Sequence, residues 1–159
     1  MKIKGLLDCD FVNYKKPCMV VEFNKCDFKC DKECGECVCQ NSALATAADI
    51  ETSYLSIVNM YIRNEITQAI CFQGLEPFDS WTDMYNLIKE FRKYTTDDIV
   101  IYTGYNENEI EDKIKEISIF KNIIIKFGRF IPNQESHYDE ILGVKLASNN
   151  QYAKKIIKG

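Results

Sequence analysis

The sequence predicts an α/β fold with a parallel sheet, because short apolar runs alternate with segments whose apolar residues recur at helical spacing. The apolar runs are rich in β-branched and aromatic residues, which favours buried strands. We expect these strands over Lys16–Asn24, Gln68–Gln73, Asp98–Tyr102 and Ile123–Phe127, and a fifth over Leu142–Leu146. No linker or repeat divides the chain, so residues 1–159 are expected to form a single domain.

The segments between the strands carry one apolar face at helical spacing, which predicts amphipathic helices. Asp49 and Ser80 stand where N-cap residues of the first two helices are expected. The helices are predicted over Ile50–Ile62, Trp81–Phe91 and Ile110–Ile117, with a short one in the tail over Gln151–Ile157.

Composition excludes several classes of function. The net charge is −4, whereas a nucleic-acid-binding domain usually has a basic surface. No apolar run approaches the ~18 residues of a membrane span, and the N-terminal residues lack the apolar core of a signal peptide. We therefore expect a cytoplasmic protein that binds neither nucleic acid nor a membrane.

The eight cysteines are the most informative feature. Thiols stay reduced in the cytoplasm, so a cysteine cluster there indicates metal or redox chemistry rather than disulfides. Five of the eight fall within fourteen residues: Cys26, Cys30, Cys34, Cys37 and Cys39. Cys18 and Cys71 lie in apolar runs and are expected to be buried as small hydrophobic side chains.

The cysteine loop fits a [4Fe–4S] cluster in two ways. Three cysteine ligands leave one iron open for a further ligand, as three protein ligands do at a catalytic zinc. Cys30, Cys34 and Cys37 have a CxxxCxxC spacing, whereas Cys26, Cys30 and Cys39 keep the first step and widen the second. A zinc knuckle built from four of the thiolates is an alternative, because C-x2-C pairs are typical of structural zinc sites.

Three segments directly follow predicted strands: the cysteine loop, Gly74-Leu75-Glu76-Pro77 and Thr103-Gly104-Tyr105. Parallel strands place their carboxyl ends along one edge of a sheet, where ligands bind. We therefore expect these three segments to converge.

The same segments belong to an ordered series of motifs. A strand runs into Cys26-x3-Cys30, and further motifs follow in order: Cys39-Gln40-Asn41, Gly74-Leu75-Glu76-Pro77, Tyr102-Thr103-Gly104-Tyr105, Gly128-Arg129-Phe130 and Ser148-Asn149-Asn150-Gln151. In this series the chain resembles the activating proteins of anaerobic ribonucleotide reductases, which are small radical S-adenosylmethionine (SAM) enzymes. It departs from the family at Leu75, where the family has glycine, and at Phe127, where it has aspartate.

The resemblance implies a short, partial (β/α) barrel-like parallel sheet of the radical SAM type, with the cluster loop at the carboxyl end of the first strand. It implies a [4Fe–4S] cluster and SAM as cofactors, and favours Cys26, Cys30 and Cys39 as the cluster ligands. The register Cys30, Cys34 and Cys37 stays open. The residues expected to bind SAM are Gly74, Leu75, Glu76, Thr103, Gly104 and Asn150, with Glu76 either fixing its turn or adding an acceptor. No catalytic residue is expected beyond the cluster and the bound SAM.

The function implied by the resemblance is reductive cleavage of SAM to a 5′-deoxyadenosyl radical. The family uses this radical to generate a glycyl radical on a partner enzyme, such as anaerobic ribonucleotide reductase. The electron would come from a low-potential donor such as flavodoxin or ferredoxin. Two alternatives remain: a radical SAM enzyme acting on another peptide or a small molecule, and a non-catalytic zinc- or cluster-binding module.

Overall fold

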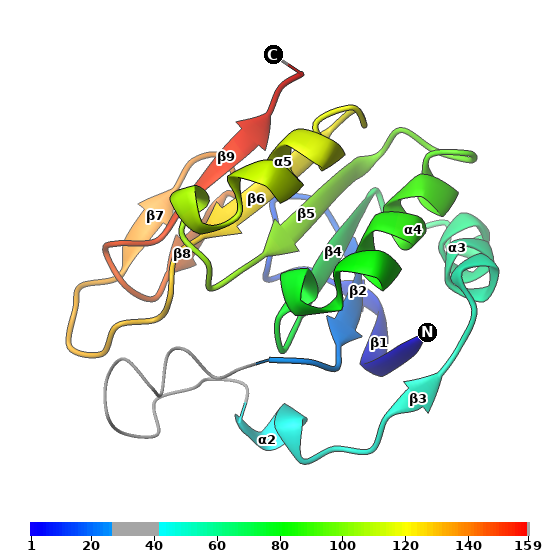
Figure 1. Ribbon diagram of the computed structural model, residues 1–159, viewed down its shortest axis with the longest axis horizontal. Coiled ribbons are helices and arrows are strands. Elements are labelled where there is room, and N and C mark those ends of the chain that lie inside the picture. The colour runs from blue at the N-terminus through cyan, green and yellow to red at the C-terminus, as the bar shows by residue number, and fades with distance from the viewer. Residues whose placement is uncertain (27–41, 159) are drawn as a thin grey trace.

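A computed structural model describes residues 1–26 and 42–158 of the chain (Figure 1). Its main feature is a seven-stranded sheet with the strand order β3-β1-β2-β4-β5-β6-β9. The strands of this sheet are β1 (Lys2–Asp10), β2 (Cys18–Phe23), β3 (Ile50–Glu51), β4 (Ala69–Gly74), β5 (Asp98–Tyr102), β6 (Ile123–Phe127) and β9 (Tyr152–Ile156). A separate two-stranded sheet pairs β7 (His137–Asp139) with β8 (Val144–Leu146).

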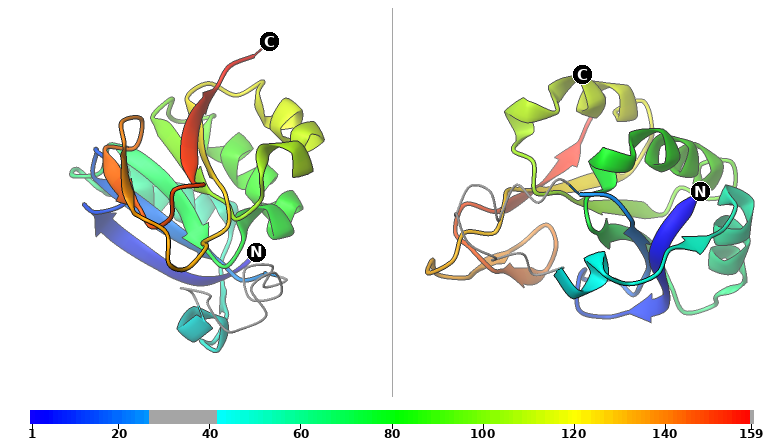
Figure 2. Two further views of the ribbon diagram at one scale, coloured as in Figure 1. Left: turned by 90° about the vertical axis from the view of Figure 1, so that its left-hand side faces the viewer. Right: turned by 60° about the horizontal axis from the view of Figure 1, so that its bottom comes forward.

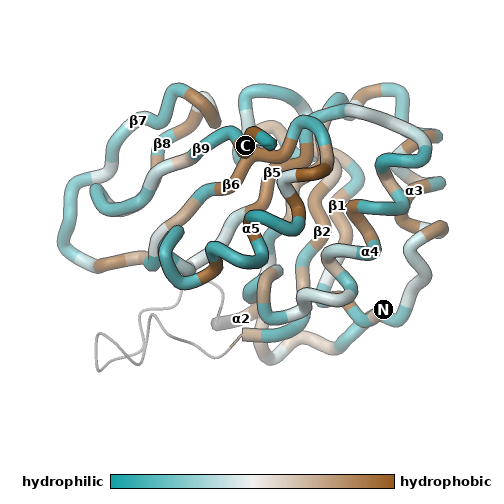
Figure 3. Tube along the Cα trace, turned by 45° about the horizontal axis from the view of Figure 1, so that its top comes forward, coloured by the Kyte–Doolittle hydropathy of each residue, from teal (hydrophilic) through white to brown (hydrophobic). Residues whose placement is uncertain are grey.

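The centre of the sheet is parallel. Strands β2, β4, β5 and β6 pair in that order, with Phe23 opposite Gly74 at the end of the first pair. These strands were predicted as apolar runs, and β5 and β6 begin and end at the predicted residues. Their side chains are buried on both faces, which explains why the runs are apolar throughout rather than alternating (Figure 3).

The helices lie between the parallel strands in sequence. They are α2 (Ser42–Ala45), α3 (Tyr54–Arg63), α4 (Trp81–Phe91) and α5 (Glu111–Ile117), with the 3₁₀ turns η1 (Pro77–Ser80) and η2 (Glu107–Glu109). Apolar residues of α3, α4 and α5 join one face of the sheet in the larger core. Figure 2 shows α4 and α5 on one side of the sheet and the β7–β8 pair on the other.

The opposite face of the sheet has a smaller core. Cys18, Val20 and Cys71 of the sheet are buried there against Leu142 and Leu146, from the β7–β8 region. Tyr14, in the segment after β1, closes the same core, and its hydroxyl donates to Asp98 Oδ2 (2.7 Å). Both faces of the parallel strands are thus covered, by helices on one side and by irregular chain and a hairpin on the other.

Four sequence predictions need correction. The tail Gln151–Ile157 is not a helix. Most of it forms β9, which pairs antiparallel with β6 and completes the sheet. The predicted fifth strand, Leu142–Leu146, shortens to β8 and pairs with β7 outside the main sheet. The first helix is capped by Ser53, whose Oγ accepts from Ser56 N–H (3.1 Å), and not by Asp49, which forms an ion pair with Lys4 (3.0 Å).

The fourth correction concerns Ser80. It occupies the N-cap position of α4, as predicted, but its side chain makes no capping hydrogen bond. The chain enters α4 through η1, in which Pro77 supplies the first residue and Glu76 Oε2 accepts from Phe78 N–H (2.9 Å). The helix start is therefore organised by Glu76, four residues earlier.

Strand β1 was not predicted. It runs antiparallel to β2 and carries two register irregularities, so its apolar residues do not alternate regularly. In the described part of the chain the sheet is open, with β3 and β9 at its edges. No helix among the described residues is long and apolar enough to cross a membrane.

Candidate metal and cofactor centre

The segments that follow β2, β4, β5 and β6 meet at one edge of the sheet, which we call the carboxyl edge (residues 24–26, 74–76, 103–105 and 128–129). The β2 and β4 ends stay paired beyond the strands themselves. Leu75 N–H donates to the Phe23 carbonyl oxygen (3.1 Å), and Glu76 N–H donates to that of Lys25 (2.7 Å). The backbone that leads into Cys26 therefore lies alongside the turn after β4, as the sequence motifs predicted.

Gly74 permits this close approach. Its φ is +90°, a backbone conformation that residues other than glycine rarely adopt. A Cβ atom at this position would lie 2.5 Å from the Phe23 nitrogen and 2.7 Å from the Glu22 carbonyl carbon. Both neighbours are backbone atoms of β2, so they cannot move aside as a side chain would. Gly74 is thus required by the packing of two strand ends.

Glu76 points into the protein and is only 5% exposed. Its Oε1 accepts hydrogen bonds from Thr103 Oγ1 (2.8 Å) and Gly104 N–H (2.7 Å), and its Oε2 accepts from Phe78 N–H. Burial raises the pKa of Glu76 from its ordinary 4.5 to about 7, although the three hydrogen bonds oppose that shift. The carboxyl group joins the turn after β4 to the turn after β5.

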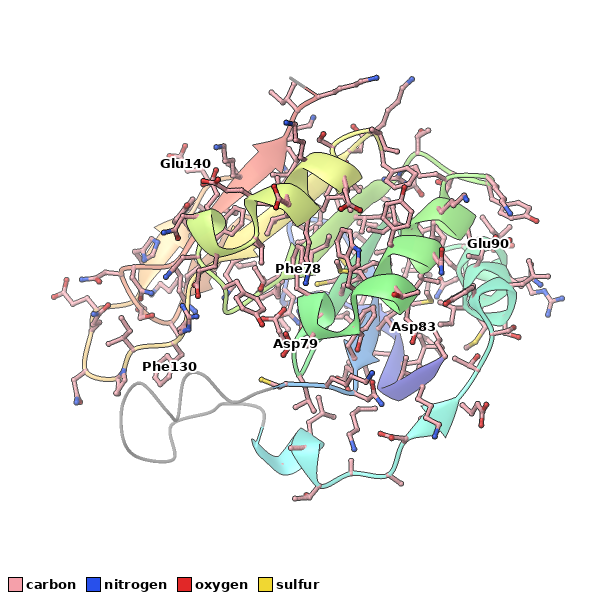
Figure 4. All side chains as sticks on the ribbon, in the orientation of Figure 1. Phe78, Asp79, Asp83, Glu90, Phe130 and Glu140 are labelled. Carbon is pink, nitrogen blue, oxygen red and sulfur yellow. The ribbon has the colours of Figure 1, made fainter. Side chains whose placement is uncertain are left out.

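Thr103 and Gly104 form the neighbouring turn. Thr103 is buried, and its hydroxyl oxygen also accepts from Tyr105 N–H (3.0 Å). Tyr105 in turn donates its hydroxyl to Asp79 Oδ1 (2.5 Å), in η1 just before α4. Figure 4 labels Phe78 and Asp79, which lie where η1 leads into α4. Predicted residues of both turns are therefore brought together by a continuous set of hydrogen bonds.

Asn150 lies one strand further along the edge. Its Nδ2 donates to the Arg129 carbonyl oxygen (2.8 Å), and its Oδ1 accepts from Ser148 Oγ (2.6 Å). Gly128, with a φ of +104°, ends β6 beside it. Asn150 therefore holds the turn after β6. This turn adjoins the one after β5, because Gly128 N–H donates to the Tyr105 carbonyl oxygen (3.1 Å) and Arg129 Cγ would lie 3.7 Å from a Cβ on Gly104.

Two charged residues at this edge were not predicted as a pair. The Arg129 guanidinium is 6% exposed and binds the Glu109 carboxylate through two hydrogen bonds of 2.7 Å each. Its carbon also lies 5.9 Å from the centre of the Tyr105 ring. The sequence offered one hint of this role, because Asn106 and Glu109 form a capping box at η2 that fixes Glu109 near the end of β5.

The described cysteines differ in burial. Cys18 and Cys71 are fully buried, as predicted, and burial raises the pKa of Cys18 to about 12 and that of Cys71 well above its ordinary value. Both therefore stay thiols, whereas a metal ligand must be a thiolate. Cys26 is half-buried at the carboxyl edge. Cys30, Cys34, Cys37 and Cys39 lie outside the described residues, so the choice between the two ligand registers stays a prediction.

Comparison with known families bears on this cysteine loop. A family model for a 4Fe-4S single cluster domain matches residues 18–153. The chain belongs to this family. A search of curated proteins found no match, and a search of solved structures found none. The match to this iron–sulfur family spans both the cysteine loop and the carboxyl edge, and a [4Fe–4S] cluster-binding domain is therefore indicated.

The residues at the carboxyl edge suit the cluster of such a domain. Cysteine thiolates are the usual ligands of iron–sulfur clusters, and Cys26 places one thiol where the strand ends meet. Within residues 1–26 and 42–158, no three His, Cys, Asp or Glu side chains are grouped to hold a metal. That Cys26 binds the cluster together with cysteines of the loop that follows it stays a prediction.

Proposed function

We propose that this 4Fe-4S single cluster domain is a radical SAM enzyme that generates a glycyl radical on a partner protein. The observation that carries the proposal is the meeting of three motif-bearing turns at the carboxyl edge. The segment leading into Cys26, the Gly74–Glu76 turn and the Thr103–Gly104 turn are joined by hydrogen bonds of 2.7–2.8 Å. When bound, the cluster would supply the electron that cleaves the sulfonium of SAM.

The chain's own residues would bind and orient SAM. We assign the backbone at Leu75, a half-buried residue, to the methionyl ammonium, because the Gly74 turn brings it beside the segment that leads into Cys26. The Thr103–Gly104 turn, one strand further from Cys26, is assigned to the adenosine. Asn150 would hold the turn after β6 on the far side of the adenosine.

The experiment that tests this proposal is turnover by reconstituted protein. Purified chain is loaded with iron and sulfide under anaerobic conditions, reduced with dithionite and supplied with SAM. We expect 5′-deoxyadenosine and methionine to form. Cys26→Ala should abolish both cluster retention and product, whereas Cys9→Ala, which removes a half-buried thiol from β1, should keep both.

A protein that retains zinc against iron and yields no 5′-deoxyadenosine would overturn the proposal in favour of a non-catalytic module. The partner is tested separately, by adding an anaerobic ribonucleotide reductase and recording its electron paramagnetic resonance (EPR) spectrum. A glycyl radical signal is the expected result. Turnover of SAM without that signal would restrict the proposal to SAM cleavage with another substrate.

A further inference from the structure

The side chain of Glu76 is held by hydrogen bonds from the protein itself. The sequence left open whether it fixes its turn or adds an acceptor for SAM. Glu76 is 5% exposed, and its carboxylate accepts from Phe78 N–H, Gly104 N–H and the Thr103 hydroxyl. Both oxygens accept hydrogen bonds, at 2.7–2.9 Å, and these three partners are all donors. A group in this arrangement fixes two turns relative to each other.

Glu76 also connects strands that are not neighbours. Its backbone N–H donates to the Lys25 carbonyl oxygen (2.7 Å), one residue before Cys26, while its carboxylate binds the turn after β5. Strands β2 and β5 are separated by β4 in the sheet. One residue therefore ties the segment that leads into Cys26 to the Thr103–Gly104 turn, two strands away.

We propose that Glu76 is a positioning residue, whose buried carboxylate holds the Thr103–Gly104 turn against the Gly74–Glu76 turn so that the two form one surface for SAM, without itself contacting SAM. This inference rests on the proposed function and specifies how its binding site is kept in shape. The position of the Thr103–Gly104 turn, assigned to the adenosine, would then depend on Glu76, which belongs to the turn assigned to the methionyl ammonium.

Glutamine cannot replace Glu76 in this role. Burial raises the pKa of Glu76 to about 7, so the variants are compared above that pH, where Glu76 is ionised. A carboxylate accepts on both oxygens, whereas an amide accepts on one and donates from the other side. If the amide oxygen stays with Gly104 N–H, its NH₂ group faces Phe78 N–H, and if it turns over, the NH₂ faces Gly104 N–H. In either orientation a donor meets a donor, and a buried N–H loses its acceptor. The substitution should therefore release one turn while changing little in size.

The test compares two ligands on two variants. Glu76→Gln and Thr103→Val each remove one partner of the hydrogen bond between the two turns. Glu107→Gln, which removes a carboxylate that binds Tyr152 and Lys154, is the control. Dissociation constants of reconstituted protein are measured for SAM and for 5′-deoxyadenosine, which has no ammonium. We expect both ligands to bind about tenfold more weakly to both variants, the effect of roughly one hydrogen bond. The control should bind both ligands as the wild type does.

The two-ligand design separates positioning from direct contact. If Glu76→Gln weakens SAM alone and leaves 5′-deoxyadenosine unchanged, Glu76 contacts the ammonium and the inference is wrong. Unchanged affinity for both ligands in both variants would also overturn it. If Glu76→Gln does not fold, Thr103→Val carries the same comparison, because it keeps the carboxylate and removes one donor.

A measurement without SAM distinguishes failure of the proposed function from failure of the inference about Glu76. Hydrogen exchange of the Gly104 and Phe78 amides is followed in apoprotein. We expect at least one of them to exchange about tenfold faster in Glu76→Gln, with the amides of β6 unchanged. If wild-type protein binds no SAM, the proposed function fails, and equal exchange in variant and wild type then overturns the link as well.

Discussion

Replacing Gly74 by alanine should destabilise the carboxyl edge strongly, and its cost can be worked out from the geometry. A side chain at a φ of +90° costs about 1–2 kcal/mol. The added Cβ would lie 2.5 Å from the Phe23 nitrogen, and relieving such an overlap in a packed region costs about 1–3 kcal/mol more. The free energy of unfolding of Gly74→Ala should therefore fall by about 2–5 kcal/mol.

Gly104→Ala is the matched control on the same edge. Its φ lies outside the left-handed region, and an added Cβ would meet Arg129 Cγ and Glu76 Oε1 at 3.7 Å, an ordinary contact distance. Its N–H, which binds Glu76, is retained. Alanine should be neutral there or stabilise the protein by up to about 1 kcal/mol, because it reduces the freedom of the unfolded chain.

The assay is thermal and urea denaturation of apoprotein, in which 1 kcal/mol shifts the melting temperature of a domain of this size by about 2–4 °C. Gly74→Ala should melt about 4–20 °C below the wild type, and Gly104→Ala at or slightly above it. Because the β2 end leads into Cys26, Gly74→Ala should also retain less iron after reconstitution. Equal melting temperatures for the two variants would refute the close-approach argument.

Three further predictions concern the ligands, pH and oxygen. Alanine at Cys26, Cys30 or Cys39 should abolish cluster retention, as judged by iron content and visible absorbance, while alanine at Cys34 or Cys37 should not. If the Cys34 and Cys37 variants lose the cluster and the Cys26 and Cys39 variants keep it, the ligands are Cys30, Cys34 and Cys37. Glu76 has a folded-state pKa of about 7 against an ordinary 4.5, so its stabilising contribution is complete below about 4.5 and is lost as the pH rises through 7. Across that window the free energy of unfolding of wild-type apoprotein should fall relative to Glu76→Gln by at most about 1.4 kcal/mol per pH unit in urea titrations, and parallel profiles would disprove it. A cluster with an iron open to solvent should bleach in air, so visible absorbance that persists for hours would count against a three-cysteine site.

The sequence predicted the parallel centre of the sheet well, because its strands are buried on both faces. In β5 and β6, continuous runs of isoleucine and valine end at polar or glycine residues, so the boundaries are visible in the sequence. The tail was mistaken for a helix since Ala153, Ile156 and Ile157 recur at helical spacing. Pairing with β6 outweighs that local pattern. In the resulting strand, Ala153 and Ile156 are buried in the cores on the two faces of the sheet.

Strand β1 was missed for a related reason. Its two register irregularities remove the alternation by which a half-exposed strand is recognised. The cap of α3 was placed at Asp49 because an acidic residue preceded the apolar pattern. Lys4, far away in sequence, instead binds that carboxylate, and no local signal revealed this pairing.

For the site, motif order was enough to predict which turns converge, because parallel strands place their carboxyl ends together. The direction of the Glu76 side chain was beyond sequence reasoning, since its partners come from the turn after β5 and from η1. The pairing of Arg129 with Glu109 depends in the same way on the relative position of β6 and η2. Local patterns thus identify the edge, whereas tertiary contacts decide which side chains face the ligand and which hold the turns.

The most direct test of the central claim, that SAM binds at a cluster held beside the carboxyl edge, is the EPR spectrum of the reduced protein with and without SAM. Anaerobically reconstituted chain is reduced with dithionite and recorded before and after addition of SAM, with Cys26→Ala as the control. We expect a [4Fe–4S] signal whose g-values shift on addition of SAM, and no such signal in the variant. A reduced cluster whose spectrum is unchanged by SAM would contradict the account.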